Sequence, residues 1–166
     1  MSSMRMQTVP METLMEVISL QLRNGGKANL TVTGKSMAPM LHHRRDSVVL
    51  IPAEGIQKKG SVILYRRENG KYVLHRVISV TRNGYVCCGD NQWEKEFVKQ
   101  TQQIAVVDSF QRNGKVYTQK EFSYRVYEFL WVELFFLRPV YIALRRGAGR
   151  IYRTVRLKSK RKANRR

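Results

Sequence analysis

Acidic residues and cysteines are scarce in this chain of 166 residues. Asp and Glu together number 12 against 31 Lys and Arg, so the formal net charge at pH 7 is +19. The only cysteines, Cys87 and Cys88, are neighbours in the sequence. Neighbouring cysteines rarely pair with each other, and two cysteines supply neither a secreted disulfide framework nor a four-ligand zinc site. We therefore expect a protein of a reducing compartment that needs no metal and no cofactor.

Long apolar runs are also missing. The amino-terminal residues lack the basic flank and the apolar run that an export signal requires. In the apolar stretch at 129–144, Glu133, Arg138 and Pro139 interrupt the pattern. A spanning helix needs about twenty apolar residues, and a charge at the membrane centre costs about 2.5–3.5 kcal/mol. The sequence therefore predicts a cytoplasmic protein without a simple transmembrane helix.

The chain does contain a sizeable apolar fraction, 43% of its residues. Between Ala28 and about Thr118 it forms short segments rich in β-branched side chains, at 47–51, 61–65, 72–80, 85–88 and 104–107. Asn-Gly pairs at 69–70, 83–84 and 113–114 suit the positive φ angles of tight hairpin turns. Because no helix-length segment separates these runs, we expect a mainly β fold with a coiled, barrel-like antiparallel sheet.

An amphipathic segment precedes the strands. Its apolar residues follow the spacing of one helix face, and they are Met11, Leu14, Met15, Ile18 and Leu22. Pro10 suits the start of this helix, and Gly25 with Gly26 suits its end. We expect a short amino-terminal helix packed on the core.

The carboxyl-terminal part differs in composition, so we divide the chain into a β domain at 1–121 and a helical extension with a basic tail at 122–166. After Glu133 there is no acidic residue, and residues 138–166 hold nine Arg and three Lys. The aromatic side chains of the extension include Trp131, Phe135, Phe136 and Tyr141. Aromatic rings and a basic tail suit a helix lying peripherally on an anionic membrane surface. The alternative is a helix that packs on the sheet and a tail that is solvated. The sequence leaves both open, as it does the oligomeric state.

Ser36 lies in a Gly-Lys-Ser-Met-Ala-Pro segment between two strand-like runs. A serine in a turn is usually only a turn former, and it becomes a nucleophile when a general base lies within hydrogen-bond reach. His75 lies in the middle of an apolar strand, where alternation places it on the opposite face from Arg76. A lone histidine in such a strand is more often structural than catalytic. The pair Ser36 and His75 is therefore a candidate only in combination with other signals.

Three other residues near Ser36 are weaker candidates for the base. His42 and His43 lie beside two arginines in what resembles a solvated loop. Lys35 precedes the serine, and adjacent side chains of an extended chain point apart.

Five segments occur in a fixed order: GKSMAPML (34–41), RDSVVL (45–50), KKGSVILY (58–65), VLHRVISV (73–80) and GDN (89–91). This set, over residues 28–107, resembles the signal-peptidase and LexA-like clan of serine peptidases. In that clan a Gly-x-Ser-Met-x-Pro segment carries the nucleophile, a later strand carries the base, and Gly-Asp-Asn follows. Bacterial signal peptidases and self-cleaving repressors use a lysine base. The His-Arg-Val context of this chain is similar to the histidine-base type of the endoplasmic reticulum and the archaea.

The resemblance implies that Ser36 is the nucleophile, that His75 is its general base and that Asp90 orients or braces the site. Such a triad needs a carboxylate to fix the tautomer of the imidazole. The alternative for Asp90 is a turn aspartate that caps its own backbone. Support of the turn and of the oxyanion is expected from Gly34, Ser36, Met37 and Pro39, with the Ser36 N–H as donor.

The chain also departs from the pattern of that clan. The second aspartate of the histidine-base type is missing, so that Glu94 or Glu96 would have to take its place. Ser61 stands where the clan usually has an aspartate at a strand start. No apolar anchor helix precedes Ser36, which makes an export-site signal peptidase doubtful but leaves the same chemistry possible.

The sequence thus predicts a serine endopeptidase that cleaves an extended leader or signal-like peptide. The alternative is a non-catalytic nucleic-acid-binding or regulatory protein that uses the basic tail on a β scaffold, although the tail lacks interleaved aromatics for base stacking. Contact between Ser36 and His75 discriminates between the two, because only a peptidase needs it. The substrate and the cleaved bond are not given by the sequence.

Overall fold

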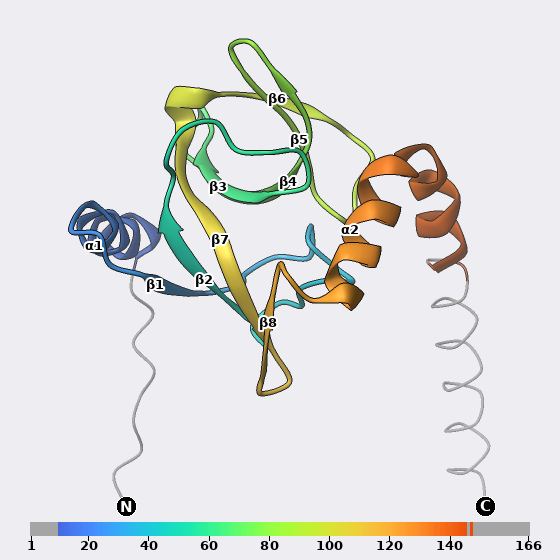
Figure 1. Cartoon of the computed structure of the whole chain (residues 1–166), viewed down its shortest axis with the longest axis horizontal. Helices are drawn as coiled ribbons and strands as arrows, with labels where there is room; N and C mark the ends of the chain where they lie inside the picture. The colour runs from blue at the N-terminus through green and yellow to red at the C-terminus, as the bar shows by residue number, and fades with distance from the viewer. Residues whose placement is uncertain (1–9, 146, 148–166) are drawn as a thin grey trace, which may run out of the picture.

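The computed structural model describes residues 10–145 and 147, which form a mainly β fold with helices at both ends (Figure 1). One antiparallel sheet contains β1 Ala28–Thr31, β2 Ser47–Pro52, β3 Val62–Arg66, β4 Tyr72–Thr81, β5 Gly84–Cys88, β6 Glu96–Lys99, β7 Gln103–Arg112 and β8 Lys115–Thr118. Helix α1 Met11–Arg23 precedes the sheet, and a 3-10 turn, η1 Gln100–Gln102, leads into β7. Helix α2 Phe122–Glu133, the 3-10 turn η2 Phe135–Leu137 and helical residues 138–145 follow it. The expected mainly β antiparallel fold with terminal helices is confirmed.

The strand order is β1-β2-β7-β3-β4-β5-β6, and β8 pairs with the end of β7. The sheet is not closed, because β1 and β6 stand at opposite ends of this order. Each of these end strands has only four residues, so neither offers a long ladder for closure. The sheet is therefore antiparallel, as expected. It is open, so the expected barrel-like closure is not observed among the described strands.

All three Asn-Gly pairs lie where antiparallel partners are joined, between β3 and β4, β4 and β5, and β7 and β8. Only Asn113 and Gly114 both adopt positive φ angles, 50° and 77°, as the tightest hairpin turn requires. Gly84 is needed for a different reason. A Cβ on it would lie 2.2 Å from the Val98 carbonyl oxygen, so β5 and β6 approach each other more closely there than a side chain permits.

The strand β4 divides the interior into two apolar clusters. Leu74 packs against the larger cluster, which also holds the buried face of α1, whereas Val73 and Val77 belong to the smaller one. His75 lies on the Val73 and Val77 face, and Arg76 points to the other side, where it contacts Tyr124. The predicted alternation along this strand is confirmed. Because of it, the buried side chains of His75 and Arg76 lie on opposite faces of β4 and contact different residues.

Both terminal helices pack on the sheet. In α1 the predicted face is buried through Met15, Ile18 and Leu22. Tyr124 of α2 is buried in the larger cluster, and its ring lies against that of Phe110 at a centroid distance of 5.5 Å, tilted by 46°. Packing on the sheet is therefore observed for one face of α2, and membrane association of the carboxyl-terminal segment stays a prediction.

Within residues 10–145 and 147, no helix is long and apolar enough to cross a membrane. The basic tail from residue 148 lies outside the described residues.

Candidate active site

Ser36 lies in the turn that follows β1, and the turn is shaped by its neighbours. Gly34 has a φ of +100°, a conformation that residues with a Cβ rarely adopt. The backbone carbonyl of Ser36 accepts a hydrogen bond from the Asn91 N–H at 2.7 Å. The turn that carries the serine is therefore tied to the loop after β5, which contains the Gly-Asp-Asn segment.

His75 is buried on β4, with 3% of its surface exposed. Its Nδ1 lies 2.8 Å from Oε1 of Glu96 and 3.0 Å from the hydroxyl of Tyr65. The strand register explains the contact with Tyr65, because Ile63 pairs with His75 and Tyr65 lies two residues further along the same face of β3. Glu96 reaches the same face from β6. Three strands thus converge on one imidazole nitrogen.

The Glu96 carboxylate is held in its ionised form. Arg67 donates two hydrogen bonds to it, at 2.7 and 2.8 Å, and Tyr65 donates a third. Burial alone would raise the pKa of Glu96, but the hydrogen bonds from His75, Arg67 and Tyr65 outweigh burial and hold this pKa well below its ordinary value. Burial and the neighbouring Glu96 carboxylate raise the pKa of Tyr65, so its hydroxyl stays protonated.

This arrangement selects one tautomer of neutral His75. An ionised carboxylate can only accept hydrogen bonds, so Nδ1 carries the proton and Nε2 carries the lone pair. Both side-chain hydrogen bonds of His75 among the described residues are made by Nδ1. Nε2 is therefore the nitrogen that can accept a proton.

Nε2 of His75 faces the turn that carries Ser36. A Cβ on Gly89 would lie 3.0 Å from Nε2 and 2.8 Å from the Ser36 carbonyl oxygen. The distance between Nε2 of His75 and the Ser36 carbonyl oxygen is therefore no greater than the sum of these two distances. The backbone of Gly89, which has no side chain, lies beside both atoms. The Gln92 Oε1 borders the same space, 2.6 Å from this Cβ position, so a side chain at residue 89 would collide with all three groups.

The hydroxyl of Ser36 and Nε2 of His75 are not hydrogen-bonded in the described part of the chain, so the structure brings the two residues together without closing the dyad. Catalytic hydrogen bonds are often loose when no substrate is bound. Among the described residues, no acceptor is found for the Ser36 N–H. This N–H is therefore available as the donor to an oxyanion.

Asp90 has another set of partners. It is fully buried, and its carboxylate accepts hydrogen bonds from Arg76 at 2.9 and 2.8 Å and from the Tyr127 hydroxyl at 3.0 Å. Arg138 lies 3.7 Å from the same carboxylate. In this arrangement Asp90 holds the loop beside the site, whereas the carboxylate at Nδ1 of His75 comes from Glu96. A direct catalytic role for Asp90 stays a prediction.

The carboxyl-terminal helices also hold this loop. The indole Nε1–H of Trp131 donates to the Asp90 carbonyl at 2.8 Å, and the Arg138 guanidinium donates to the Gly89 carbonyl at 3.0 Å. Arg138 is 3% exposed and also bonds the Trp131 carbonyl. The sequence places Arg138 in the basic carboxyl-terminal segment, but its buried guanidinium holds the backbone of the Gly89 loop and of α2. Nothing in the sequence distinguished it from the other arginines.

The remaining residues of the predicted turn have different surroundings. Met37 is 2% exposed and belongs to the larger apolar cluster, so it packs in the core and not at a peptide-binding surface. Pro39 is half-buried and follows a cis peptide bond. Lys35 is exposed, and Glu94 is exposed on the loop before β6.

His43 was expected to be a solvated loop residue, and it is exposed, but it has a specific contact. Its Nδ1 accepts a hydrogen bond from the Gly34 N–H at 2.9 Å. It therefore supports the turn that carries Ser36. No local pattern in the sequence predicts this contact, because the contact depends on the path of the loop between β1 and β2.

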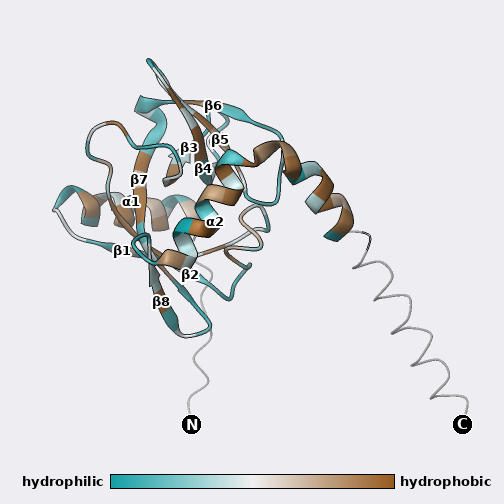
Figure 2. Ribbon diagram, turned by 45° about the vertical axis from the view of Figure 1, so that its right-hand side comes forward, coloured by the Kyte–Doolittle hydropathy of each residue, from teal (hydrophilic) through white to brown (hydrophobic). Residues whose placement is uncertain are grey.

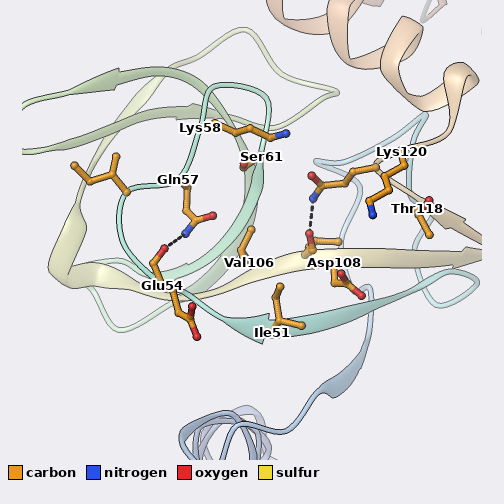
Figure 3. Close-up of a pocket in the computed structure, with 12 residues that line it drawn as sticks. Ile51, Glu54, Gln57, Lys58, Ser61, Val106, Asp108, Thr118 and Lys120 are labelled. Atoms are coloured by element: carbon orange, nitrogen blue, oxygen red, sulfur yellow. Dashed lines mark hydrogen bonds between the residues drawn. The ribbon is translucent and has the colours of Figure 1, made fainter.

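A hollow of about 620 Å³ lies elsewhere among the described residues. It is lined by the connection between β2 and β3, by β7 and by the end of β8, and Ser61, Val106 and Thr118 border it (Figure 3). Figure 3 shows Lys58 and Lys120 at its upper rim and Ile51 on its floor. Neither Ser36 nor His75 lines it. The candidate active site is therefore defined by the contacts of His75 and not by this hollow.

The described residues contain no group of three or more His, Cys, Asp or Glu side chains placed to hold a metal ion. Cys87 and Cys88 are both buried and free. Burial raises the pKa of the Cys87 thiol to about 12 and that of the Cys88 thiol to about 11, which keeps both thiols protonated.

The chain matches no protein-family model, and no curated protein resembles it in sequence.

Proposed function

We propose that this protein is a serine endopeptidase in which Ser36 is the nucleophile, His75 the general base and Glu96 the carboxylate that orients it. One observation carries the proposal: Glu96 holds Nδ1 of His75 on one side of the ring, and Nε2 faces the turn of Ser36 on the other. A buried histidine with a purely structural role has no need for a carboxylate on one nitrogen and a serine turn beside the other.

In the proposed reaction Ser36 Oγ attacks the carbonyl carbon of a peptide bond, and Nε2 of His75 takes the hydroxyl proton. The Ser36 N–H donates to the oxygen that becomes negative. Glu96 stabilises the imidazolium that forms. His75 then gives the proton to the leaving amine, which produces an acyl enzyme on Ser36. Water hydrolyses the acyl enzyme with His75 again as base, and the serine is restored.

The strand order supports an extended peptide as substrate. β1 is an end strand that pairs with β2 alone, and the chain runs from β1 directly into the turn of Ser36. An extended peptide can add to a free strand edge through main-chain hydrogen bonds, and its side chains then alternate between the two faces. We propose a leader or signal-like peptide bound in this way, and we propose that the fold is of the signal-peptidase and LexA-like type.

The test is to treat the full-length protein with a serine-directed fluorophosphonate or a penem and to locate the label by mass spectrometry. We expect label on Ser36 in the wild type, none on that residue in Ser36→Ala, and strongly reduced labelling in His75→Ala. Lys35→Ala is the matched control, and it should label as the wild type does. Label on another serine, or labelling that requires Lys35 and not His75, would contradict the assignment.

A further inference from the structure

The carboxyl-terminal helices bury one face and leave a second apolar face uncovered. In α2 the buried face contains Tyr124 and Val132, and in residues 138–145 it contains Arg138 and Ile142. The exposed apolar side chains follow the same helical spacing on the other side of each helix. They are Phe122, Val126, Phe129 and Leu130 in α2, and Phe136, Leu137, Val140, Tyr141 and Leu144 in the residues that follow. We call these nine residues the C-terminal apolar face.

Several of these side chains are far more exposed than apolar side chains that pack on a core. Phe122 is 83% exposed, and Phe136 and Leu144 are each 69% exposed. The two helices lie next to each other, because the rings of Trp131 and Tyr141 meet edge to face at 5.2 Å. Figure 2 shows hydrophobic bands along α2 and the helical segment after it, on the side of the molecule away from α1. Large apolar side chains that are exposed together on neighbouring helices mark an interaction surface.

We propose that the C-terminal apolar face docks on the surface of an anionic lipid bilayer, with both helices lying in the plane of the interface. A helix that lies in this position buries its apolar side chains at the boundary between headgroups and acyl chains. Phe and Tyr side chains suit this boundary. The surface belongs to the described helices and does not depend on the proposed activity of Ser36.

Charge selects an anionic bilayer over a second copy of the chain. The formal net charge is +19, so two copies that bring these faces together would repel each other. The sequence from 138 to 166 holds nine Arg and three Lys and no acidic residue, and it continues directly from the apolar face. Basic residues near an anionic membrane surface are attracted to it electrostatically. Of the two acidic residues of α2, Glu133 pairs with Lys59 at 2.7 Å, and the Glu128 carboxylate lies against Gly60 and not on the apolar face.

The test is co-sedimentation of the full-length protein with vesicles of phosphatidylcholine, with and without about one quarter phosphatidylserine. The variant Phe129→Ser/Phe136→Ser removes apolar surface from both helices. The matched control, Val17→Ser/Ile56→Ser, removes exposed apolar side chains elsewhere, 58% and 64% exposed. A second variant, Phe122→Ser/Leu144→Ser, tests the same face with different residues. The near-UV circular dichroism of each variant reports whether it is folded.

We expect the wild type and the control to bind anionic vesicles and to retain part of this binding at about 0.5 M salt, where charge is screened. The face variants should bind at least about tenfold more weakly at high salt, because each lost Phe removes buried apolar surface. The proposal is overturned if the wild type does not bind anionic vesicles, or if folded face variants bind as the wild type does, which would leave the tail as the only contact. It is also overturned if the wild type forms a dimer in the absence of vesicles and the face variants are monomers.

Discussion

Glu96 is the residue on which the proposed basicity of His75 depends. Its carboxylate is ionised by three hydrogen-bond donors and faces Nδ1, so it determines which imidazole nitrogen carries the proton. Asp90, which the Gly-Asp-Asn segment suggested, is committed to Arg76 on the other face of β4. The two carboxylates therefore have separable effects on activity and on stability.

Glu96→Gln tests the first effect. The amide keeps the size of the side chain but is neutral, and it no longer fixes the tautomer of His75 or stabilises the imidazolium. In a serine triad the loss of the carboxylate costs up to about 10⁴-fold in kcat, so we expect kcat to fall by about 10²–10⁴-fold with KM little changed. Steady-state kinetics on a cleaved peptide measure this, with Glu94→Gln as the control that should retain full activity. Unchanged kcat would show that Glu96 has no part in the reaction.

Asp90→Asn tests the second effect. Arg76 and Asp90 are both fully buried, and removal of one charge leaves the other without compensation. Breaking such a pair costs about 3–5 kcal/mol. We expect the free energy of unfolding, measured by urea titration, to fall by that amount, far more than in Ser36→Ala. A catalytic role for Asp90 would instead appear as lost activity in a protein of normal stability.

The pH dependence of stability follows from the lowered pKa of Glu96. The ordinary pKa of a glutamate is 4.5, and the folded protein holds that of Glu96 below it. The contribution is therefore complete above pH 4.5 and is lost as the pH falls toward the folded pKa. The difference in unfolding free energy between the wild type and Glu96→Gln should shrink below pH 4.5 in urea titrations. A difference that stays constant as the pH is lowered would mean that Glu96 is not ionised by its neighbours.

At the scale of elements, the short strand β6 is what brings Glu96 to the site. It was not expected from the sequence, because only Val98 of its four residues is buried and its other residues are polar or exposed. A strand at the end of a sheet needs few apolar side chains, so periodicity does not reveal it. The Asn-Gly pair at 113–114 did indicate the hairpin of β7 and β8, because a positive φ at two successive residues is a local requirement.

Gly84→Ala tests the contact between β5 and β6. Its Cβ would meet the Val98 carbonyl oxygen at 2.2 Å and the Lys99 Cα at 3.0 Å, both of which are backbone atoms. We expect the strands to separate and the unfolding free energy to fall by about 1–3 kcal/mol. Catalytic efficiency should fall as well, because β6 carries Glu96.

Phe97→Ala is the control in the partner strand, β6. Phe97 is 54% exposed, so its loss should change stability by no more than about 0.5 kcal/mol. Equal stability of Gly84→Ala and the wild type would contradict the close approach of the two strands.

At the scale of the whole molecule, net charge dominates. With 31 basic and 12 acidic residues, repulsion opposes the compact state and salt screens this repulsion. We expect the Tm, measured by calorimetry, to rise by about 2–4 °C when NaCl is raised from about 0.01 M to about 0.2 M, as a gain of about 1 kcal/mol would produce. KCl should act equally, because screening does not depend on the cation. A fall in Tm would indicate that the ion pairs on the surface outweigh the repulsion.

Some of this protein follows from local sequence. The spacing of apolar residues determines α1 and most strands, because helix and strand periods are local properties of the chain. The alternation along β4 determines that His75 and Arg76 face opposite sides. The order of motifs singles out Ser36 and His75, but it leaves the carboxylate open between Asp90, Glu94 and Glu96. The formal charge, likewise, is a matter of composition alone.

Only the tertiary structure decides the rest. The pairing of β6 with β5 places Glu96 at His75, and the packing of α2 gives Asp90 its partner Tyr127. Arg138, which the sequence presents as one basic residue among many, is buried against the Gly89 carbonyl. These contacts join residues far apart in the chain, and the energy of a buried charge depends on partners that no local pattern specifies. For the same reason the apolar residues of the carboxyl-terminal helices could be divided into a buried and an exposed face only after the helices were seen on the sheet.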